Sequence, residues 1–136
     1  MKHSVDYRVY YEDTDAGGVM YHASFIRFCE RGRTELLRGA GLSCANLSGE
    51  QGIIFVIRHL EADYHKPARL EDLLTVKSSI KSMKNSSFIM EQSIFCQDSM
   101  LFSATVTVVC VDSKDVRPVR LPENVRAKFM NYVEKE

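Results

Sequence analysis

The chain has 136 residues, of which 45% are hydrophobic and 26% charged, and its 18 basic side chains balance its 18 acidic ones. This length and composition are typical of one globular domain, so we expect residues 1–136 to form a single domain. A zero net charge gives no overall field to attract nucleic acid, and no apolar run approaches the ~20 residues of a membrane-spanning helix.

The N-terminus and the cysteines both predict a cytoplasmic protein. The opening residues MKHSVDYRVYY contain neither the apolar core nor the cleavage site of a signal peptide. The cysteines at positions 29, 44, 96 and 110 form no CxxC or CxxH motif and lie in or near apolar patterns. Reduced thiols in such patterns behave as small hydrophobic side chains, so we expect no disulfide framework.

The first part of the chain predicts a strand and then a long helix. Residues 5–11 alternate in the way that is typical of a strand. Residues 19–38 repeat apolar side chains at three- and four-residue spacing, with arginines and glutamates on the other side, which predicts an amphipathic helix. Gly39 and Gly41 follow this pattern and are expected to end the helix.

The remainder predicts four strands and a short helix. Long segments rich in β-branched and aromatic residues, separated by short polar breaks, cover residues 53–64, 73–83, 86–97 and 100–112. Short connections between the last three favour an antiparallel meander. Residues 121–136 begin with Pro122 in a place that suits a first helical turn, and Val125, Phe129 and Tyr132 then line one face.

This order of elements predicts an α+β fold, in which one sheet of about five strands has a single long helix on its apolar face. One helix leaves part of the sheet uncovered. Exposed sheet edges and faces favour pairing between copies, so we expect a homo-oligomer.

Residues 12–22, EDTDAGGVMYH, place three carboxylates and two glycines between the predicted strand and helix. One interpretation is that Asp13, Thr14 or Asp15 simply caps the helix. The other is that Asp15 acts on a substrate, because the free N–H groups of a helix N-terminus can stabilise an oxyanion that develops nearby. The residues alone leave both interpretations open.

Two patterns have some features of metal sites, and neither is sufficient. Asp13, Asp15 and Gly18 match positions one, three and six of a calcium loop, but position twelve is Ser24 where such loops need a bidentate glutamate. The second set is His59, Glu61, Asp63 and His65. These four share one face of a strand, but along an extended chain they span ~20 Å, too far for one ion. We therefore expect neither a metal nor an organic cofactor.

Residues 8–38, RVYYEDTDAGGVMYHASFIRFCERGRTELLR, resemble the opening of hotdog-fold acyl-CoA thioesterases of the 4-hydroxybenzoyl-CoA thioesterase type. The resemblance is closest to the Tol-Pal-associated, YbgC-like branch, and it resumes at KPARLEDLLTV, VVCVD and RPVRLP, so it covers nearly the whole chain. It implies a long central helix wrapped by a curved five-stranded antiparallel sheet, with a short C-terminal helix. It also implies dimers formed by pairing of sheet edges, often assembled into tetramers, with active sites at the dimer interface.

The function implied by this resemblance is hydrolysis of acyl-CoA to CoA and a free acid. Asp15 takes the catalytic position, as general base or nucleophile, and backbone amides at the helix start hold the thioester oxygen. We include His22 in the catalytic set, although its ring could instead be a satisfied core imidazole. Expected substrate-binding residues are Tyr11, Gly17, Gly18, Tyr21, Arg58, Lys84, Ser86, Ser87 and Arg120. In this set the glycines allow a close approach, and the serines and cations would hold CoA phosphates, with Arg117, Lys66 and Arg69 as further candidates.

Two alternatives remain beside acyl-CoA hydrolysis. A hotdog dehydratase would act on acyl-carrier-protein substrates, so acyl carrier protein is a possible partner, but that chemistry needs a histidine and an acid paired across the interface. A non-catalytic acyl-binding or scaffold subunit would not need the EDTDAGG segment. A panel of short, long and aromatic acyl-CoAs would distinguish these functions, and the sequence does not identify the preferred acyl group.

Overall fold

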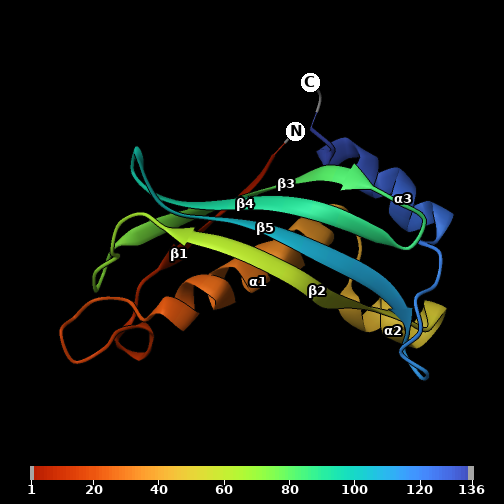
Figure 1. The fold of residues 1–136 in the computed structure, drawn as a ribbon, viewed down its shortest axis with the longest axis horizontal. Coiled ribbons are helices and arrows are strands. Elements are labelled where there is room, and N and C mark those ends of the chain that lie inside the picture. The colour runs from red at the N-terminus through yellow and green to blue at the C-terminus, as the bar shows by residue number, and fades with distance from the viewer. Residues whose placement is uncertain (1, 135–136) are drawn as a thin grey trace.

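The computed structural model describes residues 2–134, which form one five-stranded antiparallel sheet with a long helix across one face (Figure 1). The strands are β1 (His3–Arg8), β2 (Ile53–Tyr64), β3 (Leu73–Met83), β4 (Ser87–Cys96) and β5 (Ser99–Asp112). The helices are α1 (His22–Gly39), α2 (Cys44–Gln51) and α3 (Glu123–Phe129), with 3-10 helices η1 (Tyr11–Asp13) and η2 (Met130–Tyr132). The predicted α+β class is confirmed.

The sheet has the strand order β1-β3-β4-β5-β2. Strands β3, β4 and β5 form the predicted antiparallel meander. Strand β2 pairs with β5 from Ile53 opposite Asp112 to Tyr64 opposite Phe102, and a β-bulge lies between Ile57 and His59. Among the described residues β2 has no second partner strand, so this long strand is an edge of the sheet.

Helix α1 lies against the inner face of the sheet and is very close to β3. Its buried side includes Phe25, Phe28 and Leu36. A Cβ atom added at Gly32 would lie 2.6 Å from Cγ1 of Val76, so only a glycine permits this helix-to-strand approach. The apolar face predicted from the three- and four-residue spacing is therefore the face that forms the core.

A buried polar side chain also joins α1 to the sheet. Gln92 of β4 donates from Nε2 to the carbonyl of Cys29 and to Oγ of Ser78, both at 2.9 Å, and its Oε1 accepts from Nη1 of Arg33 at 3.0 Å. Burial raises the pKa of the Cys29 thiol to about 12, so this thiol is neutral at physiological pH. Cys29 is a core side chain, as its apolar surroundings predicted.

Several element boundaries differ from those predicted. Helix α1 begins at His22 instead of 19, because the preceding residues are extended: Val19 forms a bridge with Arg69, and the N–H of Met20 donates to the carbonyl of Ala68. β1 ends at Arg8 instead of 11. The C-terminal helix is shorter than the predicted range, and residues 135–136 of that range lie outside the described residues.

Helix α2 was not predicted at all. It is short, and Leu47 is its one buried residue, so its eight residues contain no extended apolar stripe. Its end signals are nevertheless present in the sequence: the Ser43 side chain accepts from the N–H of Asn46, and Gly52 follows the helix with a φ of 66°.

Within residues 2–134, none of the helices combines the length and the apolar character that crossing a bilayer requires.

Candidate active site

Residues 14–20 form a tight loop that leads into α1. Thr14 and Met20 form an antiparallel bridge, and the N–H of Asp15 donates to the carbonyl of Val19 at 2.9 Å. Gly18 closes the turn with a φ of 77°, a conformation that side-chain-bearing residues rarely adopt. A second segment holds this loop from outside, since the N–H of Leu70 donates to the carbonyl of Gly18 at 3.2 Å.

Asp13 has a structural place in this loop. Its side chain is 4% exposed, and one carboxylate oxygen accepts from the N–H of Tyr10 at 2.9 Å. Its backbone carbonyl accepts from the N–H of Tyr21 at 3.0 Å and from Oγ of Ser24 at 3.2 Å. Asp13 therefore fixes the loop to the first turn of α1.

Asp15 is exposed and closes its own turn instead of capping α1. Its Oδ1 accepts from the N–H of Gly17 at 2.8 Å and of Val19 at 3.3 Å. The other carboxylate oxygen, Oδ2, accepts no hydrogen bond from any residue within 2–134. One oxygen thus orients the carboxylate, and the other remains available to a substrate or to water.

The N-terminus of α1 has no side-chain cap. Tyr21 occupies the N-cap position without capping through its side chain, and its carbonyl accepts from the N–H of Ser24. Over the described part of the chain, the N–H groups of His22 and Ala23 have no hydrogen-bond acceptor. These two amides are free to bind an anion or a polarised oxygen. The interpretation in which Asp13, Thr14 or Asp15 caps this helix is wrong.

An open pocket of about 450 Å³ brings these groups together. Asp15 lies on one side of it, His22 and Tyr21 lie at the helix start, and Phe25 and Tyr64 provide apolar walls. The Tyr64 hydroxyl donates to the carbonyl of His22 at 3.0 Å, and its ring packs edge-on against the His22 ring with centroids 5.0 Å apart. The last residue of β2 therefore fixes the first residue of α1.

Only some of the residues predicted to bind substrate lie around this pocket. Tyr21 lines it, Gly17 and Gly18 form the adjoining turn, and Lys66 lies on its rim. Tyr11 is 81% exposed and lies outside it. The sequence analysis missed Tyr64, for which the only signal was its place at the end of a strand.

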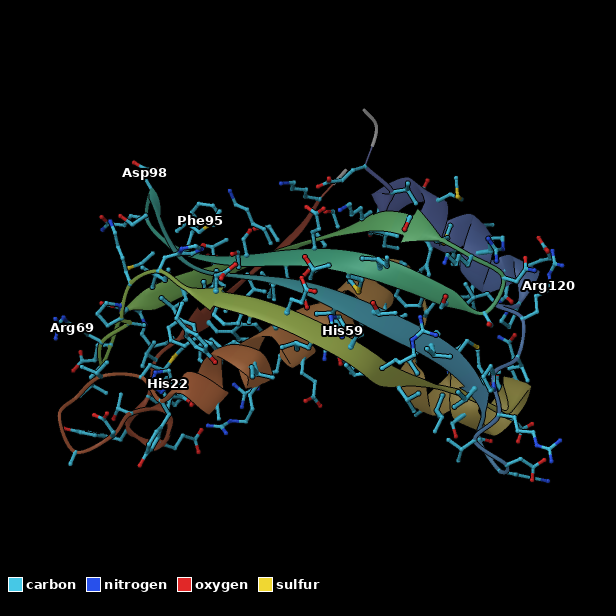
Figure 2. All side chains as sticks on the ribbon, viewed as in Figure 1. His22, His59, Arg69, Phe95, Asp98 and Arg120 are labelled. Atoms are coloured by element: carbon cyan, nitrogen blue, oxygen red, sulfur yellow. The ribbon has the colours of Figure 1, made fainter. Side chains whose placement is uncertain are left out.

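Most of the predicted phosphate-binding residues lie elsewhere, and only Lys66 and Arg69 are at the end of the protein that contains this pocket. His22 and Arg69 are at one end of the protein and Arg120 is at the other (Figure 2). Arg58 is on β2 beside the bulge, about midway between the ends. Lys84, Ser86 and Ser87 form the turn between β3 and β4, where the N–H of Lys84 donates to the carbonyl of Ser87 at 2.8 Å.

The turn that contains Lys84 is joined to the segment that contains Arg120. The N–H of Leu121 donates to the carbonyl of Asn85 at 2.8 Å, and a guanidinium nitrogen of Arg126 donates to the carbonyl of Lys84 at 2.7 Å. Arg120 and Lys84 therefore belong to one region of the surface, but that region is far from Asp15 in the same protomer.

The two histidines of the second metal pattern make separate contacts. His59 Nε2 is 3.0 Å from a carboxylate oxygen of Glu61, and His65 Nε2 is 2.9 Å from Oγ of Ser103. Over residues 2–134 no three His, Cys, Asp or Glu side chains are grouped closely enough to hold a metal ion.

Comparison with known proteins gives the family. Residues 9–129 match the family model of the Thioesterase-like superfamily. The chain belongs to this superfamily. The match spans most of the chain and includes the 14–20 loop, all of α1 and β2 through β5.

Individual relatives agree with this assignment. The chain is 46% identical over 123 residues to the acyl-CoA thioester hydrolase YbgC of Escherichia coli, covering 90% of this chain and 91% of that protein. It is 45% identical over 122 residues to the acyl-CoA thioesterase YbgC of Haemophilus influenzae, covering 90% of each. The predicted resemblance to the YbgC-like branch is confirmed.

A solved structure gives the same fold. The crystal structure of a probable thioesterase from Bartonella henselae superimposes with a TM-score of 0.86 at 40% identity, covering 90% of this chain and all of that one. The expected hotdog fold, a long helix wrapped by a five-stranded antiparallel sheet, is thereby confirmed.

Proposed function

We propose that the protein hydrolyses acyl-CoA thioesters to CoA and a free carboxylic acid in the pocket between Asp15 and the start of α1. The observation that carries the proposal is that Asp15, with one free carboxylate oxygen, lines the same pocket as His22, at the start of a helix whose first two amides are free. The 46% identity to a protein named as an acyl-CoA thioester hydrolase supports the choice of substrate.

The free amides of His22 and Ala23 are suited to the developing negative charge. When oxygen attacks the thioester carbonyl carbon, the carbonyl oxygen becomes an oxyanion. Two preorganised N–H donors at the positive end of a helix dipole stabilise that charge more strongly in the transition state than in the substrate. The His22 side chain lines the same pocket and would contact the acyl or thioester group.

Asp15 then has one of two roles. As general base, Oδ2 takes a proton from water, the water oxygen bonds to the carbonyl carbon, the C–S bond breaks and the CoA sulfur leaves with a proton. As nucleophile, Oδ2 itself bonds to the carbonyl carbon and expels the thiolate, and water hydrolyses the resulting anhydride. Both need the charged carboxylate that the Gly17 and Val19 amides orient.

The proposed assembly is a homodimer formed through the open edge of β2, with a tetramer favoured above it. Ile57 on this strand is 45% exposed, although it belongs to the apolar inner face, and a partner strand would satisfy the free backbone groups of the edge.

The cysteines are free thiols, which supports the proposed cytoplasmic location.

Replacement of Asp15 tests the proposal. Asp15→Asn keeps the size and one acceptor oxygen but can neither accept the proton nor attack, so kcat on acyl-CoA should fall by ~10²-fold or more. Thiol release from a panel of acyl-CoAs and acyl-carrier-protein thioesters measures it. Glu12→Gln, a neutralised and exposed neighbour outside the pocket, is the matched control and should retain activity. Wild-type turnover by folded Asp15→Asn would refute the assignment.

The two roles of Asp15 can be separated by isotope. In a single turnover in H₂¹⁸O with enzyme in excess, a general base puts ¹⁸O directly into the acid product. If Asp15 is the nucleophile and water attacks the anhydride at the Asp15 carbonyl, the acid product keeps an oxygen from Asp15 and the ¹⁸O enters the Asp15 carboxylate. Mass spectrometry of the peptide that contains Asp15 detects this label.

A further inference from the structure

Asp15 and the free amides lie on two different pieces of the chain. Asp15 belongs to the 14–20 loop, which extends from the N-terminal end of α1 (Figure 1), whereas the amides of His22 and Ala23 belong to α1 itself. Hydrolysis needs the carboxylate and the oxyanion site at one fixed separation, because misplacing a reacting group by about 1 Å can cost ~10²-fold in rate. The contacts that hold the loop against the helix therefore set this separation.

The loop and the helix meet at the carbonyl oxygen of Asp13. This oxygen accepts from the N–H of Tyr21 at 3.0 Å and from Oγ of Ser24 at 3.2 Å. The bond to Tyr21 closes the base of the loop, since Tyr21 directly follows it. The bond to Ser24 joins that base to a side chain in the first turn of α1, so it fixes the orientation of the loop relative to the helix.

The Ser24 hydroxyl is buried and serves a contact between segments. Its side chain is 0% exposed, where a hydroxyl without a partner would be costly. A serine inside a helix can bond a carbonyl in the preceding turn of the same helix. Ser24 instead donates to a residue eleven positions away, on the other side of the loop.

Arg27 fixes the direction of this hydroxyl. Nη2 of the Arg27 guanidinium donates to Oγ of Ser24. A guanidinium has only donors and a hydroxyl has one hydrogen, so Ser24 accepts from Arg27 and its single hydrogen is directed to the Asp13 carbonyl. The charged donor also polarises the hydroxyl, which should strengthen the bond to Asp13. Arg27 is exposed, so this role does not depend on packing in the core.

Within residues 2–134, the side chains that line the active-site pocket include neither Ser24 nor Arg27. An influence of either residue on turnover would therefore pass through the loop and not through contact with substrate. We propose that Ser24, oriented by Arg27, is a positioning residue that fixes the distance between the Asp15 carboxylate and the free amides of α1. This inference rests on the proposed function, because it takes Asp15 as the reacting carboxylate.

Ser24→Ala tests the position of the carboxylate. The change removes the donor to the Asp13 carbonyl, so kcat on acyl-CoA should fall by about tenfold or more, with KM changed by less than about twofold. Thr34→Val is the matched control, because it also removes a hydroxyl from α1. That hydroxyl is exposed and donates to the carbonyl of Glu30 in its own helix at 3.2 Å, so its loss should leave kcat unchanged. Wild-type kcat in folded Ser24→Ala would overturn the inference.

A double-mutant cycle distinguishes positioning from a general loss of structure. If Ser24 acts by placing the Asp15 carboxylate, it has no reacting group to place in Asp15→Asn, and Ser24→Ala should then reduce the residual kcat by less than about twofold. The same fold-loss in both backgrounds would show that Ser24 acts independently of Asp15, and would overturn the inference while the catalytic role of Asp15 stands. Wild-type turnover by Asp15→Asn would overturn both proposals.

Arg27 provides a variant that leaves the core undisturbed. Arg27→Met keeps the apolar stem but has no donor, so the Ser24 hydroxyl can rotate, and kcat should fall by about three- to tenfold with little change in KM. Arg27→Lys keeps one charged donor and should retain more activity. In the Ser24→Ala background, Arg27→Met should cause no further loss. A loss that is confined to KM and screened by salt would assign Arg27 to CoA binding, and would overturn its role as the residue that orients Ser24.

Discussion

Asp13 and Asp15 are two residues apart and have opposite environments. The Asp13 carboxylate is buried and bonded to the N–H of Tyr10, whereas the Asp15 carboxylate is exposed and keeps Oδ2 free. The sequence alone does not show which of these two aspartates is buried and which is exposed. The difference arises because the η1 helix turns Asp13 back toward Tyr10: the Asp13 carboxylate accepts from the N–H of Tyr10, and the Asp13 N–H donates to the Tyr10 carbonyl at 3.0 Å.

The environment of Asp13 predicts a stability defect when it is replaced. Asp13→Ala removes the acceptor of the Tyr10 N–H and should lower the free energy of unfolding by about 1–2 kcal/mol, as loss of a helix cap does. Urea denaturation at fixed protein concentration measures this. Glu12→Ala, at an exposed position in the same segment, should change stability by less than about 0.5 kcal/mol. An Asp13→Ala protein as stable as the wild type would contradict the structural role.

Tyr64 acts on the same peptide unit that carries one of the free amides. Its hydroxyl donates to the carbonyl oxygen of His22, and that carbonyl shares a planar peptide group with the N–H of Ala23. A hydrogen bond to the oxygen polarises the group and fixes its orientation, so it should make the Ala23 N–H a stronger donor to the thioester oxygen. Tyr64 is thus a positioning residue for the oxyanion site.

Replacement of the Tyr64 hydroxyl alone should affect the chemical step. Tyr64→Phe keeps the ring against His22 and Phe25 but loses the donor, so kcat should fall by about five- to tenfold with little change in KM, equivalent to one hydrogen bond of ~1 kcal/mol. Steady-state kinetics with one acyl-CoA checks this. Tyr7→Phe, which also loses a hydroxyl from a ring packed on α1, is the control and should leave kcat unchanged. A loss that appears only in KM would assign Tyr64 to substrate binding instead.

At the level of the elements, the end of α1 shows how a sequence signal becomes geometry. The N–H of Leu42 donates to the carbonyl of Leu37 at 2.9 Å and the N–H of Gly41 to that of Arg38 at 3.0 Å, which is a Schellman motif. Gly41 has a φ of 81°, in the left-handed region. The glycines after the apolar pattern predicted this helix end correctly, because the motif needs a residue without Cβ at that place.

Two glycine substitutions should therefore have opposite effects. Gly41→Ala forces a side chain into a left-handed conformation and should destabilise the protein by about 1 kcal/mol or more. Gly49→Ala lies inside α2, where an added Cβ has no heavy atom within 4 Å, and should stabilise it by about 0.5–1 kcal/mol. Denaturation midpoints of the two variants measure both. The same sign for both changes would contradict this account.

The sequence predicted the strongly periodic elements well and the irregular ones poorly. The 53–64 and 73–83 strand ranges coincide with β2 and β3, because β-branched side chains and clear polar breaks define their ends. Helix α2 has no apolar stripe, and the extended Val19 and Met20 depend on bridges to residues 68 and 69. Contacts with distant segments leave no local pattern. For the same reason Tyr64 was not predicted as part of the site.

At the scale of the whole molecule, the separation of Asp15 from Arg120 has a consequence for assembly. Both were predicted to serve one substrate, yet they lie near opposite ends of one protomer, as the positions of His22 and Arg120 show (Figure 2). An antiparallel two-fold pairing of β2 with a second β2 would reverse one protomer relative to the other. The Tyr64 end of one strand would then face the Ile53 end of its partner.

This pairing would bring the distant cations to the site. Ile53 is opposite Asp112, where β5 ends and leads into the segment with Arg120. Arg120 of the partner subunit would therefore lie toward the end of the protomer that contains the active-site pocket. CoA phosphates bound there should contribute through screened charge, so kcat/KM should fall as ionic strength rises, mainly through KM.

Subunit complementation tests whether the two residues act across the interface. Asp15→Asn removes the chemistry and Arg120→Ala weakens CoA binding, so each homodimer should be poor at subsaturating acyl-CoA. If Asp15 and the partner's Arg120 share a site, a mixed dimer contains one site in which both residues are native. Co-expression in equal amounts makes half of the dimers mixed, and each mixed dimer has one intact site of two. Activity should therefore be restored to about a quarter of the wild-type value. Tagged subunits purified in tandem isolate the mixed dimer. Activity no higher than the sum of the two homodimers would place Arg120 outside the site, and a monomer in light scattering would remove the interface itself.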